Sequence, residues 1–179
     1  MKEEDVQGST PAVSLSNGFK AEGFNSVPGN QTGKRRNRKM KLTLESASLI
    51  VDKALAKARE AKFRPMCVAV LDDGGHVKVL KREDGASILR PQVAIGKAWG
   101  AIGMGESSRS LGERLKERPA FLGALTTMSE GKVVPVPGGV LIMDGNEIIG
   151  AVGVTGGTSD EDELCAIEGI KAAGLTHKV

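Results

Sequence analysis

The chain has 179 residues, 40% of them hydrophobic and 26% charged, and its 25 basic side chains nearly balance its 22 acidic ones. This composition is typical of one globular domain and excludes a chain that is disordered throughout. No apolar run approaches the roughly 18 residues that a membrane-spanning helix needs, so we expect no membrane partner. Cys67 and Cys165 lie too far apart in sequence for a CxxC metal motif and supply no disulfide framework.

The N-terminal part of the chain differs in character from the rest. Residues 1–40 scatter Gly, Ser, Asn and Pro among charges without an apolar period, which predicts a disordered basic arm followed by a folded domain at 41–179. The basic cluster at 34–39 has no aromatic side chain beside it to stack on bases, which argues against nucleic-acid binding. No apolar segment follows Met1, so we expect no signal peptide and a cytoplasmic protein.

The first half of the folded part predicts two helices that flank a hairpin. Apolar residues recur at helical spacing over 43–61, where Thr43 is the expected N-cap. Strands are predicted at 66–71 and 77–80, because a tight turn rich in Asp and Gly separates two apolar runs. A second helix is predicted over 89–103.

Short elements follow in the next segment. Helices are predicted over 107–117 and 119–129, because Pro119 separates them. The run 133–136 is predicted to be an extended edge strand, since prolines such as Pro135 are tolerated only at a sheet edge.

The last elements are a second hairpin and a helix. The hairpin strands are predicted at 140–143 and 147–154, and the final helix at 160–173. Thr158 and Glu161 have the spacing of a capping box at the start of this helix.

Hairpin connections predict an antiparallel sheet, and its strands are apolar on both faces. Such a sheet needs helices on both sides, so we expect an α/β (α+β) fold arranged as a three-layer α/β/α sandwich. Each strand has a bulky face and a face of small residues. Gly96 and Gly100 predict that the second helix packs closely on the small face, and a planar ligand there is the alternative. The two faces of the first strand are Met66, Val68 and Val70 against Cys67, Ala69 and Leu71.

Few side chains suggest chemistry. His76 opens the second strand, and strand alternation predicts that it shares a face with Lys78, Leu80 and Arg82. It is either a metal ligand or proton carrier, or a solvent-facing turn residue. Lys97 lies in the middle of an apolar helix segment, where it is either a desolvated base or carboxylate partner, or a snorkelling lysine.

Other candidates are ambiguous. Arg82 and Asp84 either line a pocket rim or only end the hairpin. The glycine-rich run 150–158 fits no phosphate-binding motif, and the acidic residues at 160–163 after it would repel a phosphate. These acids either cap the helix or hold a divalent cation.

Several of these segments, in this order, resemble the GlcG/HbpS family, also known as DUF336 or haem-degrading-domain-like, which includes the C-terminal domain of PduO-type proteins. The resemblance spans about residues 41–175. Its motifs are Val68-Ala-Val-Leu-Asp-Asp-Gly-Gly-His76, Glu83-Asp-Gly-Ala86, Lys97-Ala98, Pro137-Gly-Gly-Val140 and Gly150-Ala-Val-Gly-Val-Thr-Gly-Gly-Thr158 with Asp162-Glu163.

The resemblance implies a profilin-like sandwich and homo-oligomers, and some family members bind haem or related tetrapyrroles. Our first hypothesis is therefore a cytoplasmic small-molecule-binding protein, with haem as ligand and His76 as iron ligand. Lys97 and Arg82 are the expected partners of the ligand carboxylates. The other expected ligand-binding residues are Asp84, Arg109, Gly138 and Gly139.

Two other hypotheses remain open. The domain is alternatively an enzyme acting on a small carboxylated or hydroxylated metabolite, with Lys97 and Asp84 or Glu83 as acid and base and Arg82 or Arg109 holding the carboxylate. A third possibility is a structural partner of a pathway enzyme. The scarcity of aromatic residues, 3% of the chain, weighs against haem.

Overall fold

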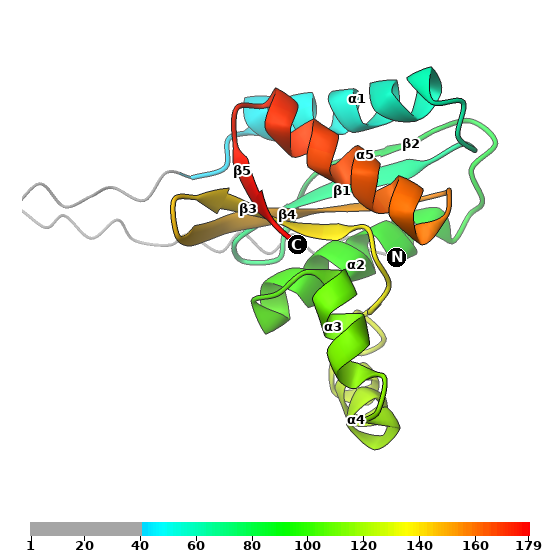
Figure 1. The fold of residues 1–179 in the computed structure, drawn as a ribbon, viewed down its shortest axis with the longest axis vertical. Helices are drawn as coiled ribbons and strands as arrows, with labels where there is room; N and C mark the ends of the chain where they lie inside the picture. The colour runs from blue at the N-terminus through cyan, green and yellow to red at the C-terminus, as the bar shows by residue number, and fades with distance from the viewer. Residues whose placement is uncertain (1–40) are drawn as a thin grey trace, which may run out of the picture. The chain divides into compact units, whose positions relative to one another are not determined.

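The computed structural model describes residues 41–179, and the predicted arm at 1–40 lies outside this range. Helices α1 (Leu44–Glu60) and α5 (Ser159–Ala172) lie side by side on one face of a sheet, and α2 (Arg90–Met104) covers the other face (Figure 1). The five strands are β1 (Cys67–Asp72), β2 (Val77–Arg82), β3 (Gly139–Asp144), β4 (Glu147–Thr155) and β5 (Thr176–Lys178).

The sheet is antiparallel throughout, with the strand order β2-β1-β4-β3-β5. Both predicted hairpins, β1–β2 and β3–β4, are confirmed. The capping box of Thr158 and Glu161 is also confirmed at the start of α5. Strand β5 was not predicted, because three residues are too few to show a period in the sequence.

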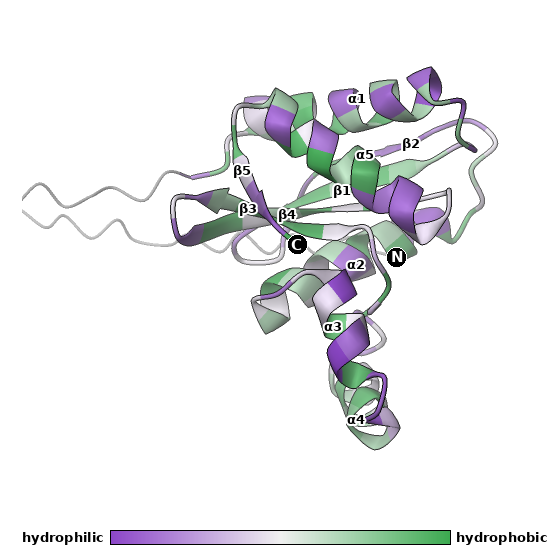
Figure 2. Cartoon of the chain, viewed as in Figure 1, coloured by the Kyte–Doolittle hydropathy of each residue, from purple (hydrophilic) through white to green (hydrophobic). Residues whose placement is uncertain are grey.

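Two separate hydrophobic cores lie on the two faces of the sheet. Val68 and Val70 of β1 pack with α1 and α5, whereas Ala69 and Leu71 pack with α2. In Figure 2 much of the central strands β1 and β4 is coloured as hydrophobic, whereas the edge strand β5 is hydrophilic. The predicted three-layer α+β sandwich with a two-sided sheet is therefore confirmed. Within residues 41–179 no helix has the length and apolar character needed to span a membrane.

Helix α2 lies very close to the sheet at one glycine of β4. A Cβ atom added to Gly153 would overlap the carbonyl oxygen of Ala94, so the helix backbone rests directly on the strand. The predicted packing of a helix on the small-residue face is confirmed, and the planar ligand proposed as the alternative is wrong because α2 occupies that face. Gly96 and Gly100 serve another purpose, since they face Val134 and Val133 rather than the sheet.

The run 133–136 is not a strand, which corrects the prediction. The segment instead crosses α2, where Val134 N donates a 3.4 Å hydrogen bond to Gly96 O. Val133 is buried against the helices that precede it. Pro135 lacks the N–H that a ladder requires, and this explains why the valines pack without pairing.

A β-bulge changes the face on which the residues of β2 lie. Leu71 pairs with Val77, whereas the preceding Val70 pairs with Val79, so β2 has one extra residue at this point. Val77 therefore shares the α2 face with Leu80 and Arg82. The predicted alternation, which put Lys78 on that face, is wrong because it assumed a regular strand.

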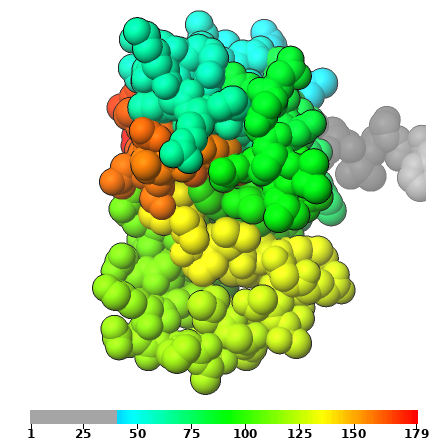
Figure 3. Space-filling view, turned by 90° about the vertical axis from the view of Figure 1, so that its right-hand side faces the viewer, coloured from blue at the N-terminus to red at the C-terminus, as the bar shows by residue number. Residues whose placement is uncertain are grey.

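Helices α3 (Ser108–Leu115) and α4 (Pro119–Met128) form a lobe beside α2. Figure 3 shows this lobe, in light green and yellow, below the sandwich. A small core joins it to α2, in which Leu111, Leu115 and Leu125 pack against Val133. Leu125 is the one buried residue of α4 in the described chain. Helix α4 is therefore attached to the rest of the domain through few side chains.

The close approach at Gly153 makes a direct prediction. Gly153→Ala should lower the free energy of unfolding by roughly 3 kcal/mol, because the methyl group forces α2 away from β4. Gly123→Ala is a matched control, since no atom lies within 4 Å of a Cβ at that helical position. Urea unfolding followed by circular dichroism measures both. Equal stability of Gly153→Ala and the unmodified protein would show that α2 does not rest on the strand.

Candidate functional site

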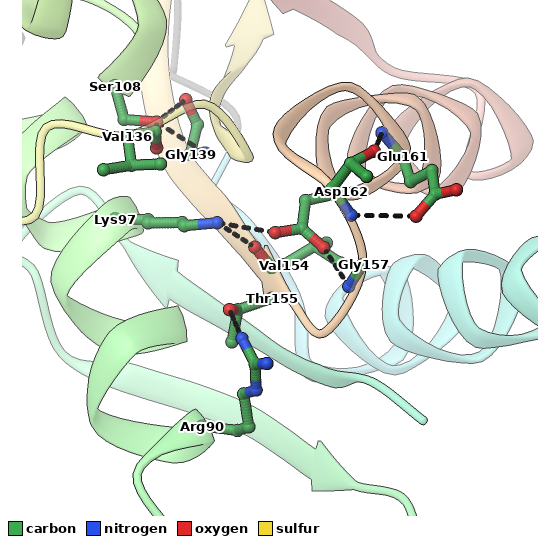
Figure 4. Close-up of polar contacts among 11 residues, drawn as sticks. Arg90, Lys97, Ser108, Val136, Gly139, Val154, Thr155, Gly157, Glu161 and Asp162 are labelled. Carbon is green, nitrogen blue, oxygen red and sulfur yellow. Dashed lines mark hydrogen bonds and ion pairs between the residues drawn. The ribbon is translucent and has the colours of Figure 1, made fainter. Parts of the chain in front are cut away.

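A buried ion pair lies at the end of β4 (Figure 4). Lys97 Nζ of α2 lies 2.7 Å from Asp162 Oδ2 of α5 and donates a 2.9 Å hydrogen bond to Val154 O. Asp162 Oδ1 accepts a 2.9 Å hydrogen bond from Gly157 N. The side chains of Lys97 and Asp162 are only 3% and 4% exposed. Both charges are therefore neutralised and enclosed within the protein.

Two glycines and a serine close over this pair. A Cβ atom at Gly138 would lie 3.0 Å from Lys97 Nζ, and one at Gly139 would overlap Lys97 O. Ser108 Oγ accepts a 2.7 Å hydrogen bond from Gly139 N and donates one of 2.7 Å to Val136 O. Gly138 and Gly139 thus allow the backbone to pass directly over the ammonium group.

Burial governs the protonation of Lys97. Desolvation lowers the pKa of Lys97 below the ordinary 10.5, and the nearby positive charge of Arg90 lowers it further. The charge and hydrogen bond of Asp162 oppose this shift without reversing it. A catalytic base must reach its substrate, but this ammonium group is closed off and already donates to two acceptors. The pair as it stands links helices and has no access to a ligand.

Arg109 lies at the edge of the same cluster. Its guanidinium group is 2.8 Å from Glu163 Oε1 and 2.5 Å from Asp160 Oδ1, so it binds two acids of the first turns of α5. Glu163 Oε2 is buried without a hydrogen bond, which costs roughly 1–3 kcal/mol. The interaction with Arg109 offsets part of this cost. The acids of 160–163 therefore bind basic side chains and the helix cap rather than a phosphate.

The β1–β2 hairpin forms a second candidate region. Asp72 Oδ1 accepts 3.0 Å hydrogen bonds from Gly74 N and His76 N, which fixes the backbone that carries the imidazole. His76 is exposed, and within residues 41–179 its ring makes no hydrogen bond. A Cβ atom at Gly75 would lie 3.0 Å from Trp99 Cδ1, so the turn packs directly on the indole. The hairpin thus has a fixed backbone at the exposed His76, and its neighbour Gly75 packs on an aromatic ring.

Arg82, Glu83 and Asp84 line a third region, an open cavity of about 460 Å³, together with Arg59 and Pro65. Glu83 Oε1 lies 2.8 Å from Arg59 Nε, and Glu83 Oε2 accepts a 2.7 Å hydrogen bond from Met66 N. Arg82 donates to the carbonyl oxygen of Ala86. Charged groups of both signs surround this cavity, which suits a polar ligand.

The predicted site residues therefore divide into three groups. Lys97, Arg109, Gly138 and Gly139 come together at the start of α5, Arg82, Glu83 and Asp84 line the open cavity, and His76 stands at the hairpin. Lys97 does not line the cavity that holds Asp84 and Glu83. Sequence reasoning missed the partners Asp162 and Ser108, although a lysine inside an apolar helix signals that a counter-charge must exist.

The cysteines take no part in these regions. Cys67 and Cys165 are buried and free, and burial raises the pKa of each thiol to about 11. Both therefore stay protonated at neutral pH. Residues 41–179 also contain no group of three or more His, Cys, Asp or Glu side chains arranged to hold a metal ion.

The sequence matches one protein family over most of the folded part. The model of that family, described as "Haem degrading protein HbpS-like", matches residues 42–171. An uncharacterized 15.0 kDa protein of Citrobacter freundii, from the dhaT-dhaS intergenic region, is 28% identical over 125 residues, which are 70% of this chain and 87% of that protein.

Two further matches involve PduO. The corrinoid adenosyltransferase PduO of Salmonella typhimurium is 30% identical over 126 residues, which are 70% of this chain but only 37% of PduO. The chain thus corresponds to little more than a third of that enzyme. The crystal structure of a PduOC:heme complex superposes with a TM-score of 0.70 and 25% identity, over 78% of this chain and 100% of that one.

The buried ion pair predicts a strong effect on stability. Lys97→Met should lower the free energy of unfolding by roughly 3–5 kcal/mol, because it leaves the Asp162 carboxylate buried without a counter-charge. The double variant Lys97→Met/Asp162→Leu should recover about 2 kcal/mol relative to the sum of the single changes. Chemical denaturation of the four proteins measures this coupling.

Lys132→Met is the matched control, since its 2.8 Å pair with Glu130 is exposed. We expect this variant to be as stable as the unmodified protein, because an exposed pair contributes little to stability. Strictly additive single and double changes at Lys97 and Asp162 would contradict the assignment of a coupled buried pair.

Proposed function

This chain belongs to the HbpS-like family of haem-degrading proteins, and from that premise we propose that it binds haem or a related tetrapyrrole. The observation that carries the proposal is the likeness to the PduOC:heme complex, which this chain covers over its full length. Haem is a planar apolar ring with an iron atom and carboxylates, so its site needs an axial ligand, apolar contacts and cations.

The β1–β2 hairpin fits the first two requirements. The imidazole of His76 is exposed and makes no hydrogen bond among the described residues, so a ring nitrogen is available to iron. Apolar side chains lie close to it, with Val77 next in the strand and 47% exposed and Trp99 packed under the turn. We therefore assign His76 as the iron ligand and Trp99 as part of the apolar wall.

The need for a cation at the haem carboxylates favours a different lysine from Lys97, which the sequence suggested. Lys97 is enclosed in its pair with Asp162, and Arg82 lies at the opposite end of β2 from His76. Lys78 follows His76 by two residues in the chain, at the start of β2, and is half-buried. We therefore propose Lys78 as the cation nearest to a haem carboxylate.

A surface site of this kind leaves part of the ligand uncovered, so we further propose a homo-oligomer in which a second copy covers the haem. Ile88 and Leu89, which precede α2 with 82% and 66% of their surface exposed, offer a separate apolar surface for assembly at the Arg82 end of the sheet. We also propose a cytoplasmic location, which suits two free cysteines that form no disulfide.

Bound haem would supply iron-centred redox or ligand-binding chemistry. The chain's own contribution would be to hold the iron through His76, whose backbone Asp72 fixes, and to keep water from one face of the ring with Trp99 and Val77. Hydrogen bonds from His76 N and Gly74 N to Asp72 would fix the backbone from which the imidazole projects.

One observation favours a second function. The cavity of about 460 Å³ that contains Arg59, Arg82, Glu83 and Asp84 has the charges to bind a small carboxylated metabolite. In that case Arg82 would hold the carboxylate and Asp84 would act as acid or base, without the Lys97 that the enzyme hypothesis paired with Asp84 or Glu83. Lys97 would act only as a scaffold residue.

Haem binding is tested by titrating the protein with hemin and recording its Soret band. We expect a saturable shift, and at least tenfold weaker binding for His76→Ala because the axial ligand is lost. His177→Ala is the matched control, since it removes the chain's other histidine and should leave the titration unchanged.

An identical titration of His76→Ala and the unmodified protein would overturn the assignment of the iron ligand. A panel of small organic acids in thermal unfolding separates the alternative. A rise in Tm with a carboxylate that Arg82→Ala abolishes, together with no response to hemin, would replace haem binding by the metabolite function.

A further inference from the structure

A separate apolar cavity lies between α2 and α4. Its volume is about 250 Å³, and Trp99, Met104, Leu125, Met128 and Val133 form its walls. Gly103 of α2 also lines it, and a Cβ atom there would have no neighbour closer than Trp99 Cζ3 at 3.9 Å. No protein atom therefore fills the space next to Gly103 on this side of α2.

The size of this cavity limits what can occupy it. An apolar cavity of about 150 Å³ holds benzene, whereas drug-sized ligands need roughly 300–1,000 Å³. The volume of about 250 Å³ thus suits one or two fused rings and excludes a complete tetrapyrrole. A haem bound at His76 and an occupant of this cavity are different molecules.

The walls limit the chemistry of the occupant. None of the lining residues is charged, and Ser129 supplies the one side-chain hydroxyl group among them. Ser129 Oγ makes only a 3.3 Å hydrogen bond to Thr126 O, so it can still accept a bond. Burying a charged group here would be costly, because no counter-charge lines the cavity.

Helix α4 leaves apolar side chains exposed beside this cavity. Its ten residues, Pro119–Met128, contain no charged side chain, and Figure 2 colours the helix largely as hydrophobic. Met128 lines the cavity, yet it is 78% exposed. A ring in the cavity would cover this thioether, and methionine and tryptophan both make favourable contacts with aromatic rings.

We propose that the cavity between α2 and α4 binds a small uncharged aromatic molecule of one or two rings that carries at most one hydrogen-bonding group. Trp99 and the two methionines contact the ring faces, and Ser129 accepts a hydrogen bond from its N–H or O–H group. Trp99 separates this cavity from the hairpin of His76, since the indole edge at Cδ1 faces Gly75 and the edge at Cζ3 faces Gly103.

The test uses the single tryptophan of the chain as its reporter. Trp99 gives one side-chain N–H signal in a ¹H–¹⁵N spectrum, and indole is the probe. We expect indole to shift this signal with a dissociation constant on the order of 0.1–1 mM, the range for a ligand of about ten heavy atoms. Benzoate, which is charged, should cause no shift at the same concentration.

Gly103→Leu fills the cavity from α2 and should weaken indole binding at least tenfold. Gly123→Leu is the matched control, because it makes the same change at a helical glycine of α4 that does not line the cavity. Met128→Ser, at an exposed position, should weaken binding several-fold without affecting the fold.

No shift of the Trp99 signal with indole, or equal shifts in Gly103→Leu and the unmodified protein, would overturn the proposal. An equal shift with benzoate would also overturn it, because the cavity would then not select uncharged rings. His76→Ala should bind indole normally. The failure of the haem proposal and the failure of this one therefore give different results.

Discussion

The contact between Lys97 and Asp162 connects the two helical layers. Lys97 belongs to α2 below the sheet and Asp162 to α5 above it, and Val154 at the end of β4 accepts a hydrogen bond from the same ammonium group. The remaining oxygen of Asp162 holds the turn that enters α5. A buried pair of this kind adds little net stability, but removing either partner is costly. The arrangement of the loops at this end of the sheet therefore depends on the pair.

The two ends of the sheet therefore differ: the charged side chains at α5 are paired, whereas the hairpin has a side chain free to bind a ligand. Around α5 the charged groups pair with one another, because Lys97 binds Asp162 and Arg109 binds Asp160 and Glu163, although Glu163 Oε2 has no hydrogen bond. At the β1–β2 hairpin the imidazole of His76 is exposed next to the apolar side chain of Val77. Residues that already neutralise one another are poor ligand contacts, so the proposed haem chemistry belongs to the hairpin.

Local patterns in the sequence predicted most of the fold. Both hairpins, the five helices and the capping box follow from period, turn residues and prolines, each of which acts over a few positions. The strand predicted over 133–136 was wrong, because the prediction gave more weight to the β-propensity of the valines than to the missing N–H of Pro135. The bulge in β2 and the strand β5 depend on cross-strand pairing, which one strand's sequence does not reveal.

The candidate site was harder to predict, because its contacts join distant segments. Lys97 was recognised as unusual in an apolar helix, but its partner Asp162 is 65 positions away and belongs to a run of acids suited to capping. The glycine pair Gly138–Gly139 was expected to contact a ligand, and its visible role is to let the backbone cross the ammonium group. Chain packing alone brings these groups together.

The central claim is that ligand chemistry occurs at the hairpin, while the ion pair serves as scaffold. Paramagnetic broadening of backbone amide signals by ferric hemin tests this most directly, since it maps which residues lie near the iron. We expect the signals of residues 72–79 to broaden first while those of 156–163 remain sharp. Broadening centred on 156–163, with a sharp hairpin, would contradict it.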